Sequence, residues 1–301
     1  MAGQGNLILG MATGYAAKDL RPFVQSLAMS GFQGRLGLFV YRGQVASIRA
    51  MAQLHAPALD LDLIVVDGIR RYARFWRSCF KRLFAMMPAE MSPALKRSML
   101  RFQGMPHVTR HFHYDDYLRA NPGFTQVMLT DVRDVVFQDE PFGQFEGGLC
   151  VGMESDALTL ATETYDREWI LGAYGEAMLQ QIGDRQISCA GVVIGDAQAM
   201  REYIDKMLLE ILRLPFRITK NRNYDQAHHN KLLYCHDLTA TTTWCQPLSS
   251  QIATVGVMNS SVFQLTADGV LLNEDGRVAP IVHQYDRHPA LVEAFAVRFS
   301  R

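Results

Sequence analysis

One short apolar run that ends in carboxylates constrains the fold of this chain more than any other feature: residues 127–137, VMLTDVRDVVF. A strand that is apolar on both sides is typical of the buried centre of a mainly parallel sheet. Asp131 and Asp134 then fall at the carboxyl edge of that strand, where open α/β sheets bind ligands. Paired carboxylates suit a hard divalent cation that carries phosphate oxygens, so the run predicts a nucleotide-phosphate site. A simpler interpretation is that Arg133 pairs with Asp134 at a strand-to-loop corner.

The N-terminal part of the chain alternates strand and helix patterns. Residues 6–15 (NLILGMATGY) predict a first strand that ends in a small loop, and residues 21–32 predict the helix after it. The runs 35–43 (RLGLFVYRG) and 61–68 (LDLIVVDG) predict two further strands with a helical pattern between them. This alternation is typical of a parallel sheet. The glycine-rich run at 147–152 predicts the strand that follows the acidic run, because no helix start or lysine comes after it as in a phosphate-binding loop.

Three later segments resemble a known enzyme family. They are QISCAGVVIGD at 186–196, YDQAHHNKLLY at 224–234 and IVHQYDRHP at 281–289. In this order and spacing they are similar to the small-residue turn, the D-Q segment and the C-terminal histidine of GT-A glycosyltransferases, particularly the retaining family 8 type. The resemblance implies a GT-A fold: a Rossmann-like α/β domain with a mixed, mainly parallel sheet flanked by helices.

The resemblance also implies roles for individual residues. Asp131, Asp134 and His283 would hold Mn²⁺ or Mg²⁺. Asp225 and Gln226 would face the reacting sugar as the catalytic pair. The nucleotide-sugar donor would lie against a larger set of residues: Thr13, Gly14, Tyr15, Arg110, Asp131, Arg133, Ser188, Cys189, Ala190, Gly191 and His288.

The acidic motif departs from the family pattern, which is D-x-D. Here the second acid comes one residue later, in Asp131-Val132-Arg133-Asp134. Residues i and i+3 of a strand point to different faces, so the two acids converge only if the chain turns after Val132. Otherwise Arg133 can neutralise the diphosphate itself, because a guanidinium binds phosphate bidentately. Cys189 also replaces the usual asparagine or serine.

Composition narrows the class of protein. The 301 residues are 49% hydrophobic and 20% charged, which is ample material for one large α/β domain over residues 1–301. The formal net charge is zero, so the overall charge of the chain does not favour binding to nucleic acid. Without a run of roughly 18 apolar residues or a basic secretory start, the chain is expected in the cytoplasm. The five cysteines form no C-x-x-C pair, which predicts reduced thiols.

Residues 70–104 are predicted to form a basic, amphipathic helical insertion. Nine Lys or Arg between 70 and 101 face a single acid, Glu90. Phe75, Cys79 and Leu83 recur at helical spacing between these charges. In the resembled family, an insertion at this place would lie on the acceptor side.

Three interpretations of this basic insertion stay open. Its apolar side can pack on the core while the basic side is solvated. The helix can instead lie on an anionic membrane surface, on the inner face, with Trp76 at the level of the headgroups. Nucleic acid or another acidic partner is the least favoured interpretation, although basic residues interleaved with aromatics also suit a phosphate backbone.

Most of the nine histidines are expected to be structural. His111 and His113 share a face only in an extended segment and have no cysteine at ligand spacing, so a zinc site there is not favoured. One of His228 and His229 can face an acceptor, because they follow the D-Q segment on a predicted helix. The acid and the arginine at 286–287 are expected to pair with each other in a turn.

The sequence therefore predicts a hexosyltransferase-type glycosyltransferase that moves a sugar from a nucleotide-diphosphate donor to a hydroxyl of a cell-surface glycan or glycolipid. If the outcome is retaining, the departing phosphate can accept the acceptor proton; if it is inverting, Asp225 is the candidate base. Two alternatives belong to other classes. One is a non-catalytic protein that binds a nucleotide sugar or polyanion, and the other is a membrane-associated adaptor that acts through the basic insertion.

Overall fold

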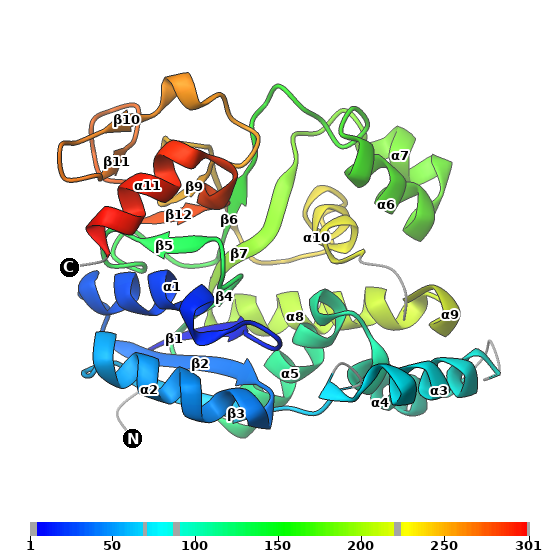
Figure 1. Cartoon of the computed structure of the whole chain (residues 1–301). Coiled ribbons are helices and arrows are strands. Elements are labelled where there is room, and N and C mark those ends of the chain that lie inside the picture. Colours follow the sequence, from blue (N-terminus) through cyan, green and yellow to red (C-terminus); the bar gives the residue numbers. More distant parts are fainter. Residues whose placement is uncertain (1–4, 69–70, 87–90, 220–223, 300–301) are drawn as a thin grey trace.

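Strands and helices alternate through the first half of the computed structural model (Figure 1), which describes residues 5–68, 71–86, 91–219 and 224–299. The strands are β1 (Asn6–Met11), β2 (Gly34–Val40), β3 (Asp60–Val65), β4 (Gln126–Thr130), β5 (Val135–Phe137), β6 (Leu149–Met153), β7 (Ser188–Asp196), β8 (Thr242–Cys245), β9 (Ile252–Thr254), β10 (Gln264–Leu265), β11 (Leu271–Leu272) and β12 (Ile281–His283). The helices are α1 (Ala17–Met29), α2 (Val45–His55), α3 (Arg74–Ala85), α4 (Pro93–Gln103), α5 (Pro106–Ala120), α6 (Thr164–Tyr174), α7 (Glu176–Ile182), α8 (Ala197–Arg213), α9 (Phe216–Thr219), α10 (Asp225–Tyr234) and α11 (Pro289–Arg298), with short 3₁₀ turns η1 (Arg42–Gln44), η3 (Ser260–Val262) and η4 (Tyr285–Arg287).

A seven-stranded sheet in the order β3-β2-β1-β4-β7-β6-β8 forms the centre of the described chain. Most neighbours run parallel, and β7 runs antiparallel to both β4 and β6. The fold is thus mixed α/β with a mainly parallel sheet flanked by helices, as predicted, and it is compatible with a Rossmann-like arrangement. The strand order reverses beside β1, so the carboxyl ends of β1 and β4 border a switch point where such sheets bind ligands.

Alternate residues of the central strands build two apolar layers. Leu7 and Leu9 of β1 join a buried cluster with α5 and α8 on one face, whereas Ile8 joins α1 and α2 on the other. This period of two is what a strand covered on both faces requires. The run at 127–130 alternates in the same way, which confirms that it is a buried, central strand.

The acidic run at 127–137 contains a second strand after the acids, which the sequence did not predict. A bend at 132–134 separates β4 from β5, and β5 leaves the central sheet to pair with β12 in a second sheet of order β5-β12-β9. The antiparallel register places His283 opposite Val135. The N–H of Gln284 donates to the carbonyl of Asp134 at 2.8 Å. This second sheet therefore carries the C-terminal histidine to the acids, and the run at 147–152 becomes β6, the next strand of the central sheet.

The helix predicted at 21–32 begins earlier, at Ala17. The carboxylate of Asp19 accepts a hydrogen bond from the N–H of Ala16 at 2.9 Å, which satisfies one of the free donors at the helix start. The helix ends before Gly31, whose φ of +82° favours glycine.

The basic insertion forms α3 and α4, which lie together at the lower right of Figure 1. Arg70 and residues 87–90, which include Glu90, lie outside the described residues. All five cysteines are free thiols, as expected. No helix among the described residues has the length and apolar character to cross a bilayer.

Candidate functional site

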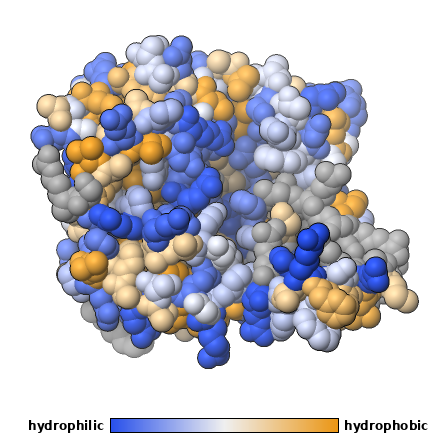
Figure 2. Space-filling model, in the orientation of Figure 1, coloured by the Kyte–Doolittle hydropathy of each residue, from blue (hydrophilic) through white to orange (hydrophobic). Residues whose placement is uncertain are grey.

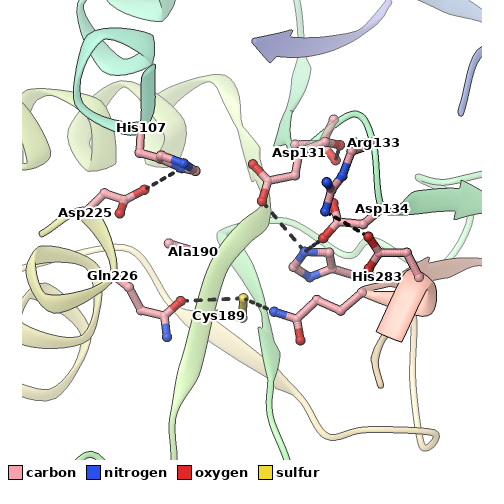
Figure 3. Close-up of polar contacts among 12 residues, drawn as sticks. His107, Asp131, Arg133, Asp134, Cys189, Ala190, Asp225, Gln226 and His283 are labelled. Atoms are coloured by element: carbon pink, nitrogen blue, oxygen red, sulfur yellow. Dashed lines mark hydrogen bonds and ion pairs between the residues drawn. The ribbon is translucent and has the colours of Figure 1, made fainter. Parts of the chain in front are cut away.

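The bend between β4 and β5 brings the three predicted metal-binding residues together. One ligand atom from each of Asp131, Asp134 and His283 lies within 4.8 Å of the other two. Nε2 of His283 is 3.8 Å from Oδ2 of Asp131 and 3.9 Å from Oδ2 of Asp134 (Figure 3). The chain thus turns after Val132, as the shifted motif requires. Within the described part of the chain, no other group of three His, Cys, Asp or Glu side chains is close enough to share an ion.

Gly191 of β7 keeps the centre of this group open. A Cβ at this position would stand 2.3 Å from Cε1 of His283 and 2.8 Å from Oδ2 of Asp131. Neither ring nitrogen of His283 has a hydrogen-bond partner among the described residues, although the ring is almost fully buried. Ligands at about 2.1 Å from a central ion lie roughly 3 to 4 Å apart. The donor set and its spacing therefore fit a divalent cation such as Mg²⁺ or Mn²⁺.

Arg110 of α5 connects the acidic group to the D-Q segment. Its Nη1 donates to Oδ1 of Asp131 and its Nη2 to Oδ2 of Asp225, each at 2.7 Å. Nη2 also donates to the carbonyl of Ala190 at 3.2 Å. One guanidinium is shared by two carboxylates and Asp134 adds a third, so the site keeps an excess of negative charge that favours a cation.

The same contacts set the protonation states in the site. Burial by itself would raise the pKa of Asp131, but Arg110 and then His283 hold it well below its usual range. Burial raises the pKa of Asp134, and the nearby His283 only partly opposes this. Burial lowers the pKa of His283, yet the two acids outweigh it and the net pKa is raised.

A cleft of about 610 Å³ opens beside the acidic group, at the carboxyl ends of β1, β2 and β4. Figure 2 shows hydrophilic side chains around a hollow near the centre of this face. The cleft is lined by the predicted donor residues Thr13, Gly14, Tyr15, Arg110, Asp131 and Arg133 and by the predicted metal ligand Asp134, together with Met11, Tyr41, Arg77, Met105, Pro106, His107 and Val132. The first loop, the acidic bend and α5 thus meet in one cavity.

Gln44 shapes the first loop of this cleft. Its Nε2 donates to the carbonyls of Ala12 and Tyr15, at 2.9 and 2.7 Å, and its Oε1 accepts from the N–H groups of Gly14 and Tyr41, at 3.2 and 2.8 Å. One amide therefore ties the ends of β1 and β2 together, and Gly14 supplies a φ of +89° for the turn.

Cys189 and Gln226 lie in a buried polar row behind the acidic group. The thiol of Cys189 faces Oε1 of Gln226 at 3.6 Å and accepts from Nε2 of Gln284 at 3.4 Å (Figure 3). Gln226 in turn donates to both oxygens of Asp166, at 2.9 and 3.1 Å. Burial raises the pKa of Asp166 to about 7, although the bond from Gln226 lowers it. Burial also raises the pKa of Glu154 at the end of β6.

Two predicted donor residues point elsewhere. The hydroxyl of Ser188 contacts Nε2 of His229 at 2.9 Å in the interior. His288 donates from Nε2 to the carbonyl of Val255 at 2.7 Å, and its ring packs on Phe263. Neither lines the cleft. Their predicted roles stay predictions.

Other sequence expectations are changed by tertiary contacts. Arg133 pairs with Asp286 at 2.8 Å, and not with Asp134 as the simpler interpretation held. This contact also replaces the expected pair within 286–287. His228 and His229 are both buried and bond to tyrosine hydroxyls, so they contact the interior of the protein instead of an open surface.

Sequence reasoning missed Glu154 and Asp166. Glu154 could have been found by the signal that found Asp131, because it is an acid at the end of an apolar strand. Asp166 had no such signal, since it lies in the first turn of a helix where an acid is ordinarily a helix-stabilising residue. No sequence pattern indicated the role of Gln44 in the first loop either.

No protein-family model matches this chain. A search of curated proteins likewise finds no matching relative. The family resemblance of the motifs therefore stays a prediction, and the case for a function rests on the geometry of the cleft.

Proposed function

We propose that this chain is a GT-A-type, metal-assisted glycosyltransferase that binds a nucleotide-diphosphate sugar in the cleft and transfers the sugar to a hydroxyl of a glycan or glycolipid. The observation that carries the proposal is the group of Asp131, Asp134 and His283 around a centre that Gly191 keeps open. This group stands at the wall of a cleft large enough for a nucleotide.

The residues of the chain would bind and orient the donor. A bound divalent cation would neutralise negative charge on the diphosphate, which increases as the sugar leaves. Arg110, held between two carboxylates, fixes the position of Asp131 at the cleft wall. Arg133 is half exposed at the same wall and can exchange its contact with Asp286 for a phosphate oxygen. Thr13, Gly14 and Tyr15 contribute the first loop to the wall of the same cleft.

Asp225 and Gln226 would define the sugar end of the site. Oδ2 of Asp225 lies 2.7 Å from Arg110 and 4.0 Å from Nδ1 of His107, a residue of the cleft wall. In an inverting reaction Asp225 would accept the acceptor proton after releasing Arg110. In a retaining reaction the leaving phosphate would accept it, and Asp225 would only position the sugar.

A second candidate is a protein that binds the nucleotide sugar without turnover. It is favoured by the buried bond between Arg110 and Asp225, because Oδ2 of Asp225 is already occupied by the guanidinium and is not free to accept a proton from an acceptor. The two candidates differ in turnover alone, since both require nucleotide binding. Conversion of a radiolabelled nucleotide sugar to nucleotide supports the enzyme, provided that Asp131→Asn, which removes a proposed metal ligand, abolishes it.

The first test is thermal unfolding with UDP, GDP or dTDP and their sugars, with CMP as a monophosphate control, in Mn²⁺, Mg²⁺ or chelator. A ligand at one hundred times its dissociation constant stabilises by about 2.7 kcal/mol, which raises the midpoint by several degrees. We expect a metal-dependent rise for one diphosphate, lost in Asp131→Asn and Asp134→Asn and retained in Asp184→Asn, a highly exposed acid. No rise with any diphosphate would refute the proposal.

A further inference from the structure

The helix α3 carries aromatic and aliphatic side chains both against the protein and on its exposed surface. Phe80 faces the protein and packs on Tyr72 and Phe102, with ring centroids 5.7 and 5.4 Å apart. Another side of the helix is apolar and exposed: Phe75, Trp76 and Leu83 are 68%, 55% and 52% accessible. At 3.6 residues per turn these three align along the helix with two further exposed residues, Cys79 and Met86. The apolar face therefore points away from the core, contrary to the interpretation that it packs inside.

Only part of the basic insertion is available to a partner. Lys96 is buried against the carbonyls of Leu212 and Leu214. Arg97 pairs with the acids at 115–116, and Arg101 with the second of them. Arg71 pairs with Asp67.

Among the described residues of the basic insertion other than the buried Lys96, the charges without an ion-pair partner lie on α3. In the part of the chain that the structure describes, Arg74, Arg77 and Arg82 have no ion-pair partner. Arg74 and Arg82 lie along one edge of the apolar side and are exposed. The space-filling view shows hydrophobic residues beside strongly hydrophilic ones at the lower right, where α3 lies (Figure 2).

The same helix reaches the cleft. Arg77 follows Trp76 directly and lines the cavity that holds Asp131 and Arg133. Trp76 belongs to the exposed apolar side and Arg77 to the cleft wall. A flat surface that covered the apolar side of α3 would therefore lie next to the cleft.

We propose that α3 docks on an anionic lipid bilayer through Arg74, Phe75, Trp76, Cys79, Arg82, Leu83 and Met86, so that the cleft receives an acceptor carried by a membrane lipid. The acceptor class rests on the proposed function; the docking does not. A row of aromatic and aliphatic side chains flanked by arginines suits insertion at the level of lipid headgroups, with the charges on the phosphates. A nucleic acid would instead need the charges along the middle of the contact, where this helix is apolar.

The test is sedimentation of the full chain with phosphatidylcholine vesicles, with and without about one phosphatidylglycerol in three lipids. We expect binding to the anionic vesicles that weakens with salt, and a blue shift in the emission of Trp76. Trp76→Glu and Leu83→Glu should each reduce partitioning at least about tenfold, as should Arg74→Gln/Arg82→Gln. The matched control is Leu54→Glu on α2, because Leu54 is 75% exposed but has no such surroundings, and it should bind as the wild type does.

Two results would overturn the docking. One is absence of binding to anionic vesicles, which would favour an acidic protein or a nucleic acid as the partner of α3. The other is unchanged binding of both glutamate variants. Asp131→Asn should still bind vesicles although it loses the nucleotide response, so failure of the docking and failure of the proposed function are distinguishable.

Discussion

A methyl group on Gly191 would stand 2.3 Å from Cε1 of His283, closer than any side-chain carbon can approach a ring. The strand β7 and the short strand β12 are far apart in the sequence. At this point, however, the His283 ring on β12 leaves no room for a side chain on β7. The contact explains why a glycine stands at the centre of the acidic group. Under the proposed function, this space beside two carboxylates and an imidazole is where the divalent cation would bind.

Gly191→Ala should therefore abolish metal binding. The added methyl must displace His283 or Asp131, at a cost of about 1–3 kcal/mol in the free energy of unfolding. The decisive measurement is the increase in the unfolding midpoint on addition of Mn²⁺, which the wild type should show and the variant should lack. Gly43→Ala is the control, because a Cβ there meets open space. A full Mn²⁺ response in Gly191→Ala would contradict the assignment of the metal site.

Arg110→Met should destabilise the protein by about 3–5 kcal/mol, because it leaves the carboxylates of Asp131 and Asp225 without their shared partner in a largely buried site. Urea denaturation measures this change. The double variant Arg110→Met/Asp225→Asn should recover part of the loss, since one of the two unpaired charges is removed. Arg133→Gln serves as the control, and its exposed pair with Asp286 should contribute less than about 1 kcal/mol. Equal stabilities of the two arginine variants would argue against a central role for Arg110.

Asp166 should make the protein less stable as the pH rises towards neutrality. Its pKa is raised from 3.8 to about 7 on folding, so between these values the folded state holds a proton that the unfolded state has lost. Stability then falls as the pH rises through this window and stays level above it, a change on the order of a few kcal/mol. In Asp166→Asn this dependence should become shallower, and Glu154 should supply part of what remains. Unfolding midpoints at about pH 4.5 and pH 7.5 test this, with Asp184→Asn as a control that keeps the wild-type slope.

Lys96→Met should cost about 1–3 kcal/mol of stability, although Lys96 belongs to the basic insertion. Its ammonium donates to the carbonyl of Leu212, in the last turn of α8, at 2.5 Å, and to that of Leu214, which follows the helix. Methionine would leave these buried carbonyls without that donor. The exposed Lys18→Met should change the free energy of unfolding by less than about 0.5 kcal/mol. A loss of stability no larger than that of Lys18→Met would mean that Lys96 is solvated. Lys96 would then count among the charges that can bind a partner.

The sequence predicted the parts of the fold that repeat with a fixed period. The first three strands, the buried strand before Asp131 and the mixed, mainly parallel sheet all follow from apolar runs that alternate with helical patterns. These patterns reflect burial on two faces, which a single segment already encodes. The sequence also pointed to Asp131 and Asp134, as acids at the end of an apolar strand, and to His283 through the family resemblance of its segment.

Only the tertiary structure decided which of those residues meet. After the bend that follows Val132, an unpredicted strand, β5, enters a second sheet, and its pairing with β12 sets the acids beside His283. The pairings of Arg133 with Asp286, of Lys96 with α8 and of Arg110 with two acids join segments that are far apart along the chain. Charge and periodicity fix what a residue can do, but its partner depends on which surfaces the fold brings into contact. The same reason explains α3: its sequence is amphipathic in any context, and the fold decides that its apolar side faces outward.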